Sequence, residues 1–169
     1  MRILGICGSL QSHSNNLALL RVAAATVPAG VELIIFDGVR ALPHFNPDLE
    51  AVGVSESVTQ WRHAVATSDA LFIACPEYGF SLPGALKNAI DWVIGSGELE
   101  SKVVAITAAV PTRERGRRGL NALRETLSAV RASIVGGEPI PLGADFEKAV
   151  RELLQLVVAA ARDARHPGA

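Results

Sequence analysis

The sequence predicts a doubly wound α/β fold, in which helices cover both faces of a parallel β-sheet. Five short apolar segments alternate with segments of helical periodicity along the 169 residues. Most of the strand segments are apolar on both faces, as expected for strands buried between two helix layers. The resulting order is βαβαβαβαβα, which predicts a parallel sheet.

The predicted strands are runs of β-branched and apolar residues. They cover residues 2–7, 31–36, 70–75, 102–108 and 132–135. Each is followed by a segment with a helical apolar pattern, so each connection returns the chain to the same end of the sheet.

The predicted helices begin at residues that favour helix starts. The first covers about residues 15–26 and the second about 57–67, where Ser57 and Gln60 have capping-box spacing. The third begins near Pro83, and the last follows Asp145 as N-cap. The apolar stripes of the last three helices are Leu86, Ala89, Ile90, Val93 and Ile94; Leu120, Leu123, Leu127 and Val130; and Phe146, Val150, Leu153, Leu154, Val157 and Val158.

Composition indicates one globular domain. Hydrophobic residues make up 49% and charged residues 20%, which excludes a disordered chain. We find neither repeats nor a linker, so residues 1–169 are predicted as a single domain with a frayed tail at 162–169. No segment approaches the roughly 20 apolar residues of a membrane span, so we expect no membrane association. Sixteen Lys and Arg against seventeen Asp and Glu give a net charge of -1, too balanced for nucleic-acid binding.

The two cysteines, Cys7 and Cys75, lie outside any C-x-x-C spacing and favour neither a disulfide framework nor a zinc site. We expect both to be buried small hydrophobes rather than redox residues. The apolar start breaks at Gly8 without a cleavage site, so we expect no signal peptide and a cytoplasmic protein.

The loop after the first strand, residues 8–16, combines hydroxyl and amide side chains with a helix start. Ligands of parallel α/β sheets bind beyond the carboxyl ends of the strands, where helix N-termini offer free amides. This loop could therefore bind a phosphate through neutral donors, and an ordinary polar N-cap is the alternative. Neither a P-loop nor G-x-G-x-x-G is present, and we interpret Asp37 as a turn residue.

The loop after the third strand, residues 76–84, holds two prolines and two glycines that fix its backbone direction. Tyr78 and Phe80 add aromatic surface, which suits a flat ring contacted largely by main-chain groups. Plain packing is the alternative for both aromatic side chains.

Together the two loops resemble the NADPH-dependent FMN reductase family, which includes quinone, azo-dye and chromate reductases. The motifs are G-S-L-x-x-x-S-x-N and P-E-Y-x-x-S-x-P-G-x-L-K-N-A-I-D-W, and residues 42–50 resemble the family's L-P-x-F-N-x-D-L-E. The resemblance spans about residues 1–161 and implies a flavodoxin-like fold with strand order 2-1-3-4-5. It implies FMN as cofactor, NADPH or NADH as electron donor, and free flavin, quinones or similar small molecules as acceptors.

The resemblance also implies which residues hold FMN. The phosphate would contact Ser9, Ser14, Asn16 and the amide of Asn15, with Gln11 where the family usually has Arg. The isoalloxazine ring would be lined by Pro76, Glu77, Tyr78, Gly79 and Phe80, with Gly79 in place of the usual Asn.

Residues 108–112 lack the Ser and Gly that relatives often place against the flavin. Together with Gln11 and Gly79, this departure leaves open the possibility that the chain is a family member whose flavin binding is weakened. Four arginines follow this loop, namely Arg113, Arg115, Arg117 and Arg118. They could form a clamp that binds the phosphates of the nicotinamide cofactor, and the alternative is a solvated loop and helix start.

No catalytic triad, paired carboxylate or metal-ligand cluster stands out, so we nominate no catalytic side chain and no metal. Hydride transfer through a flavin needs chiefly positioning. A noncatalytic electron carrier is the main alternative, and its usual strongly acidic surface is absent at a net charge of -1. A phosphoacceptor signalling domain needs acidic residues after the first and third strands, which end here in Cys7 and Cys75.

In the family, the helix beginning near Pro83 commonly forms a dimer interface. We therefore expect a homodimer or homotetramer, with Trp92 as an anchor. Lys87 and Asp91 have the i, i+4 spacing of a surface ion pair. The histidines His44, His63 and His166 are expected to be structural or solvated.

Overall fold

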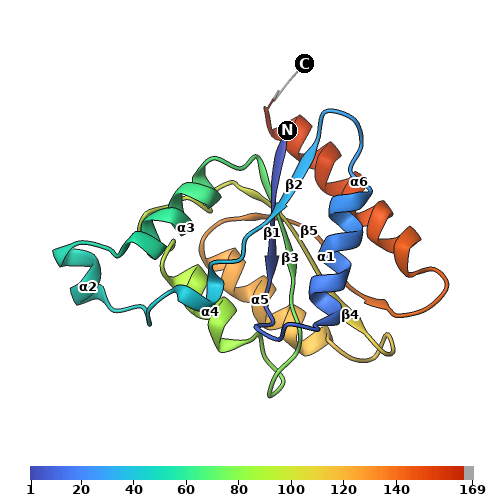
Figure 1. The fold of residues 1–169 in the computed structure, drawn as a ribbon, viewed down its shortest axis with the longest axis horizontal. Helices are drawn as coiled ribbons and strands as arrows, with labels where there is room; N and C mark the ends of the chain where they lie inside the picture. Colours follow the sequence, from blue (N-terminus) through green and yellow to red (C-terminus); the bar gives the residue numbers. More distant parts are fainter. Residues whose placement is uncertain (166–169) are drawn as a thin grey trace.

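A computed structural model describes residues 1–165 and contains one five-stranded parallel sheet of order β2-β1-β3-β4-β5 (Figure 1). The predicted fold class and strand order are confirmed. The strands are β1 (Arg2–Cys7), β2 (Glu32–Ile35), β3 (Ala70–Ala74), β4 (Val103–Val110) and β5 (Ser133–Pro141).

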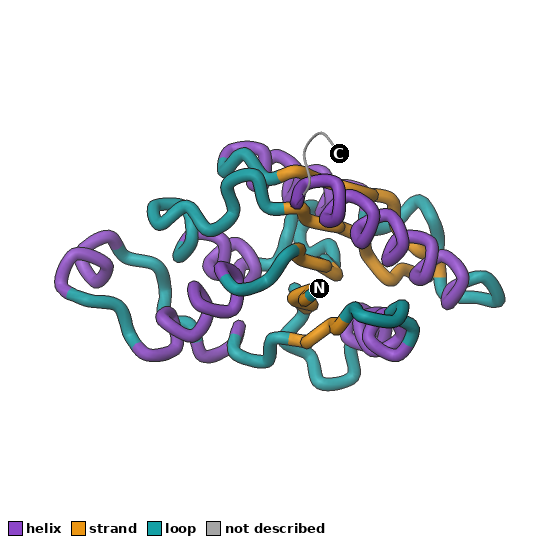
Figure 2. The backbone as a smooth tube through the Cα atoms, turned by 90° about the horizontal axis from the view of Figure 1, so that it is seen from above, coloured by secondary structure: helices purple, strands orange, loops and turns teal. Residues whose placement is uncertain are grey.

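Helices cover both faces of the sheet, and Figure 2 shows the strands as a layer between them. One face packs against α1 (Asn15–Ala25) and α6 (Phe146–Arg165). The other packs against α3 (Glu56–Ala66), α4 (Gly84–Asp91) and α5 (Arg117–Ala129). None of the helices in this part of the chain is long and apolar enough to cross a membrane.

Two apolar cores lie on opposite faces of the sheet because strand side chains alternate in direction. In β3, Leu71 and Ile73 belong to the core under α3, α4 and α5. Ala70 and Phe72, from the same strand, belong to the core under α1 and α6. All four are buried, which explains why the strand is apolar throughout.

Strand β5 is longer than predicted, since the prediction ended at residue 135 and the strand continues to Pro141. Gly136 and Gly137 have φ angles of 71° and 109°, and the pairing register of β4 with β5 shifts between Ile106 and Ala108. The two glycines resemble a turn in the sequence but form an irregularity within the strand. Pro139 fits because β5 is an edge strand.

Two short helices were not predicted, namely the 3-10 helix η1 (Val39–Ala41) and α2 (Pro47–Val52). The Asn46 side chain caps α2 by accepting from the Asp48 amide at 2.9 Å. The capping box predicted at Ser57 is wrong. The N-cap of α3 is Ser55, whose Oγ accepts from the Val58 amide at 3.4 Å.

The prediction of Trp92 as an interface anchor is wrong. Helix α4 ends at Asp91, and the Trp92 side chain that follows is 1% exposed. Its indole Nε1 donates to the carbonyl of Pro43 at 2.8 Å, so it fastens the segment before α2 to α4. The ion pair between Lys87 and Asp91 is confirmed, at 2.6 Å.

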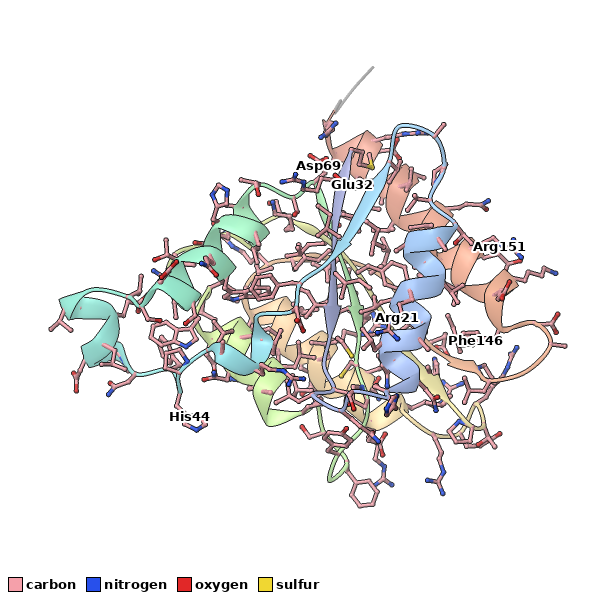
Figure 3. All side chains as sticks on the ribbon, in the orientation of Figure 1. Arg21, Glu32, His44, Asp69, Phe146 and Arg151 are labelled. Atoms are coloured by element: carbon pink, nitrogen blue, oxygen red, sulfur yellow. The ribbon has the colours of Figure 1, made fainter. Side chains whose placement is uncertain are left out.

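Helix α6 continues to Arg165, so residues 162–165 of the predicted frayed tail are helical. Residues 166–169, and with them His166, lie outside the described residues. His44 lies at the surface of the segment between η1 and α2, as Figure 3 shows, in keeping with a solvated residue.

Candidate functional site

The loops after β1, β3 and β4 meet at the carboxyl edge of the sheet, at the bottom of Figure 1. Backbone hydrogen bonds continue the ladder into these loops. The Gly8 amide donates to Ala74 O at 2.9 Å, and the Cys75 amide donates to Thr107 O at 2.8 Å. The three loops therefore start from one fixed framework.

The first loop presents hydroxyl groups at the start of α1. Ser14 is the N-cap, and its Oγ accepts from the Asn16 amide at 3.2 Å. Ser9 Oγ accepts from the Gln11 amide, also at 3.2 Å. The amide of Asn15 has no acceptor within residues 1–165, as expected in a first helical turn. The first loop therefore carries hydroxyl groups and a free amide at the start of α1, and the phosphate site stays a prediction.

Asn16 has a structural bond that the sequence did not indicate. Its side chain is buried, and its Oδ1 accepts from the Ala109 amide of β4 at 2.9 Å. This bond fixes the start of α1 against the sheet. The Nδ2 group is the part of Asn16 that can donate to a ligand.

The loop after β3 turns back on itself at residues 78–81. The Tyr78 and Ser81 amides each donate to the other's carbonyl at 3.0 Å. Gly79 and Phe80, between them, have φ angles of 57° and 64°, the positive values of a type I′ turn. Glycine and asparagine are the residues that tolerate this conformation best, which explains why Gly79 can stand where the family usually has Asn.

Tyr78 connects the first and second loops. Its phenol oxygen lies 3.2 Å from Ser9 Oγ, across 69 residues of sequence. The Tyr78 side chain is 53% exposed and that of Phe80 is 69% exposed. Tyr78 therefore presents aromatic surface beside Ser9, and Phe80 is exposed in the same turn.

Glu77 connects the second loop to α5. Its Oε2 accepts from the amides of Arg118 and Gly119 at 3.0 and 3.2 Å. Gly116, the N-cap of α5, has no side chain that could do this. A Cβ on Gly119 would lie 3.0 Å from Glu77 Cα, so the close approach requires glycine there. The Glu77 side chain thus positions the loop, and the backbone groups of Glu77 remain available to contact a ligand.

A cavity of about 570 Å³ lies between the loops after β3 and β4. Ligand pockets in proteins measure about 300–1,000 Å³, so the volume is in the range of a small-molecule site. The residues that line it are Pro76, Glu77, Phe80, Ala109, Val110, Pro111, Glu114, Arg115, Gly116 and Arg118.

The four arginines after β4 separate into two groups. Arg117 pairs with Glu138 at 3.0 Å, and its Nε donates to Arg113 O. Arg115 and Arg118 line the cavity, and the Arg118 guanidinium lies 4.2 Å above the centre of the Phe80 ring. Two of the four arginines can therefore reach a ligand in the cavity.

A second, smaller cavity of about 60 Å³ adjoins the first loop. Its lining includes Ser9, Gln11 and Ser12 from the first loop and Asp37 and Arg40 from the segment after β2. The sequence did not indicate Arg40, because it lies 30 residues from the loop carbonyl that it contacts.

Cys7 and Cys75 are both buried free thiols, as expected. Burial raises the pKa of both, to about 12 for Cys75. Both therefore remain protonated at neutral pH and lack the thiolate that redox chemistry requires. Throughout residues 1–165, no three His, Cys, Asp or Glu side chains gather in a way that could hold a metal ion.

The strand order, the two helix layers and a cavity at the carboxyl edge of the sheet define a flavodoxin-like protein. Within that class, the profile of the NADPH-dependent FMN reductase family matches residues 1–145. The chain belongs to this family, which confirms the resemblance found in its two loops.

Individual relatives agree with the family assignment. An NAD(P)H-dependent FMN reductase of Pseudomonas aeruginosa is 39% identical over 129 residues, which are 75% of this chain and 69% of that protein. A quinone reductase of Pseudomonas putida is 32% identical over 125 residues, 72% of this chain and 67% of that protein. FerB of Paracoccus denitrificans, a flavoenzyme NAD(P)H:(acceptor) oxidoreductase, superposes with a TM-score of 0.82 at 27% identity, covering 97% of both chains.

Proposed function

We propose that this protein is an FMN-dependent NAD(P)H oxidoreductase that reduces free flavin, quinones or similar small acceptors. Family membership supports the reaction class. The observation that carries the site assignment is the junction of the two loops, where Ser9 Oγ and Tyr78 OH lie 3.2 Å apart. One loop suits a phosphate and the other suits a ring, as a flavin mononucleotide requires.

The first loop holds the phosphate of FMN. Ser9, Gln11 and Ser14 offer neutral side-chain donors, and Asn16 offers Nδ2. The amide of Asn15 and the positive end of the α1 dipole add to them. The donor set fits a phosphate, because the loop contributes no carboxylate.

The second loop holds the flavin ring, largely through its backbone. The residues are Pro76, Glu77, Tyr78, Gly79 and Phe80. FMN, when bound, supplies the centre that accepts a hydride and passes it on. The protein's part is to orient the reactants and exclude water, and no side chain of the site is assigned as an acid or base.

The electron donor binds where Phe80 and Arg118 face the cavity. The Phe80 ring offers a stacking surface for nicotinamide, and the guanidinium groups of Arg115 and Arg118 attract the phosphates of NADPH or NADH. Arg117 takes no part in this, because it pairs with Glu138.

Two experiments test this function. Titration with FMN, followed by quenching of flavin fluorescence, should give a micromolar or tighter Kd. NADPH and NADH oxidation with menadione or FMN as acceptor should then show turnover. Tight FMN binding without turnover would favour an electron carrier, and absence of FMN binding would mean that Gln11, Gly79 and the loop at residues 110–112 have abolished the site.

The proposal extends to the state and setting of the molecule. Residues 1–169 form one domain that acts as a cytoplasmic homodimer or homotetramer. Exposed apolar side chains on α2, Leu49 and Val52, support self-association. Light scattering coupled to size-exclusion chromatography gives the oligomer mass, and a mass of one chain would contradict this part of the proposal.

A further inference from the structure

We infer that Arg40 binds the phosphate group held at the first loop and supplies the positive charge that the loop itself lacks. This inference rests on the proposed function, because it concerns the same flavin. Arg40 belongs to η1, after β2, and lies outside both sequence motifs that identify the family.

The first loop has neutral donors for a strongly charged ligand. Residues 8–16 include neither Lys nor Arg. A phosphate monoester carries a charge of about -1.5 to -2 at neutral pH. Hydrogen bonds from charged donors are about twice as strong as neutral ones, so a nearby guanidinium would add substantially to the affinity.

The fold brings Arg40 to this loop. Strand β2 pairs in parallel with β1, so the segments that follow both strands lie at the same edge of the sheet. Val39, the neighbour of Arg40, is buried and anchors η1 to the core. Arg40 Nη2 donates to Leu10 O at 3.2 Å, which holds the guanidinium against the loop.

The Arg40 side chain lines a cavity together with two of the proposed phosphate-binding residues, Ser9 and Gln11. Ser12 and Asp37 also line that cavity. The cavity of about 60 Å³ is too small for a flavin ring but adjoins the hydroxyls that would hold a phosphate. Arg40 therefore faces the charged end of the ligand.

The guanidinium has donors to spare. It carries five N–H groups, and the bond to Leu10 O uses one of them. No carboxylate in the described part of the chain forms an ion pair with it, although Asp37 lines the same cavity. A guanidinium without a carboxylate partner, beside clustered hydroxyls and amides, is suited to an anion.

The test compares FMN with riboflavin, which has the same ring and ribityl chain but no phosphate. Arg40→Gln should weaken FMN binding about ten-fold, the loss expected for one charge-assisted hydrogen bond, and leave riboflavin binding unchanged. Because the lost contact is ionic, the difference between wild type and variant should narrow as salt is raised. Binding is measured by flavin fluorescence and needs no turnover.

Arg21→Gln is the matched control. Arg21 lies on the outer surface of α1 (Figure 3), so this variant changes the net charge equally without touching the cavity. It should bind both flavins like the wild type. Circular dichroism verifies that both variants are folded.

The remaining outcomes contradict the inference. Equal weakening of FMN and riboflavin by Arg40→Gln would mean that Arg40 only holds the Leu10 carbonyl and the shape of the loop. Unchanged FMN binding would mean that it makes no contact with the phosphate. A wild-type protein that binds neither flavin would overturn the proposed function itself. That result differs from the failure of the inference, in which the wild type binds FMN and the Arg40 variant binds it equally well.

Discussion

Phe80 combines an exposed aromatic side chain with a positive φ angle. Its ring is 69% exposed, and its backbone has a φ of 64°, a conformation uncommon for residues other than glycine. Backbone strain of this kind clusters at functional sites. The type I′ turn and the Arg118 guanidinium hold the ring at the mouth of the cavity.

Phe80→Ala should therefore lower kcat/KM for NADPH by about three- to ten-fold, because it removes a stacking surface worth about 0.5–1.5 kcal/mol. Steady-state kinetics with menadione as acceptor measures the effect. Phe80→Tyr keeps an aromatic ring and is the control, which should stay near wild type. Equal kcat/KM values for the Ala and Tyr variants would contradict a stacking role.

The two neighbouring arginines of α5 should behave differently. Arg118→Ala removes a guanidinium that faces the cavity, and we expect the KM for NADPH to rise about ten-fold. Arg117→Ala removes an exposed pair with Glu138 and should leave the KM unchanged. Initial rates at increasing NADPH concentration give the KM of each variant. A larger rise in KM for Arg117→Ala than for Arg118→Ala would contradict the role of Arg118 in binding the donor.

The N-cap of α5, Gly116, has no side chain that could accept from the first-turn amides, and a residue of another element does so instead. The Glu77 carboxylate accepts from two first-turn amides of this helix. A carboxylate at a helix N-terminus also interacts favourably with the helix dipole. The contact joins the loop after β3 to the start of α5, and both segments line the cavity.

Glu77→Ala should lower the free energy of unfolding by about 1–2 kcal/mol, the usual cost of a lost cap. Urea denaturation followed by circular dichroism provides the value. Glu125→Ala, on the exposed side of the same helix, is the control and should change stability by less than about 0.5 kcal/mol. A Glu77 variant as stable as the Glu125 variant would show that α5 does not need this cap.

Sequence patterns were sufficient for elements whose signals are local. The strand β1 was predicted to the residue, and α1 and α4 were predicted within a few residues, because periodicity and caps lie within each segment. The end of β5 was missed, since Gly136 and Gly137 are turn-like in isolation and become part of a strand only beside β4.

The same distinction applies to the site. The two loops were found because each carries its own dense motif. Three contacts of this region join residues that are 30 to 93 positions apart, so local spacing gave no sign of them. They are the contacts of Glu77 with α5, of Arg40 with Leu10 and of Asn16 with Ala109. Trp92 was misjudged because burial depends on the segment around Pro43, which packs over it.

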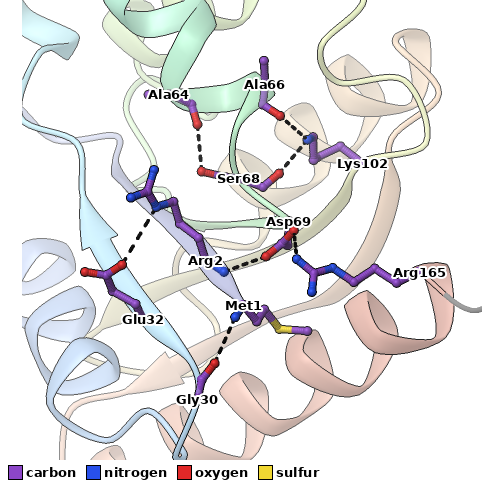
Figure 4. A network of polar contacts seen from close by, with 10 residues as sticks. All are labelled: Met1, Arg2, Gly30, Glu32, Ala64, Ala66, Ser68, Asp69, Lys102 and Arg165. Atoms are coloured by element: carbon purple, nitrogen blue, oxygen red, sulfur yellow. Dashed lines mark hydrogen bonds and ion pairs between the residues drawn. The ribbon is translucent and has the colours of Figure 1, made fainter.

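At the scale of the whole molecule, the candidate site and the two ends of the described chain lie at opposite edges of the sheet. Asp69, at the amino edge, accepts from the Arg2 amide at 2.6 Å and pairs with Arg165, which links β1, β3 and α6 (Figure 4). Lys102 Nζ donates to Ser68 O at 2.7 Å beside it. This network holds both ends of the described chain to the sheet.

The network predicts a pH-dependent contribution to stability. Burial raises the pKa of Asp69, but the hydrogen bonds from Arg165 and the Arg2 amide outweigh it, so the pKa lies below its usual value. The stabilisation is therefore complete above the unfolded-state pKa of about 3.9, and it is lost as the pH falls through the lower folded-state value.

Asp69→Asn should cost about 1 kcal/mol at pH 7, a figure reduced for partial exposure. Urea unfolding should give the same difference from wild type between pH 8 and 5 and a shrinking difference below about pH 4. FMN affinity should not change, because the site is at the other edge. A difference that already shrinks between pH 8 and 5 would contradict this account of the network.

The central claim is that one flavin mononucleotide spans the two loops at the carboxyl edge. A crystal structure of the protein with FMN tests it most directly. We expect the phosphate to lie against Ser9, Ser14 and the Asn15 amide, and the ring to lie beside residues 76–80. A flavin bound elsewhere, or loops closed over their own side chains in the presence of saturating FMN, would contradict it.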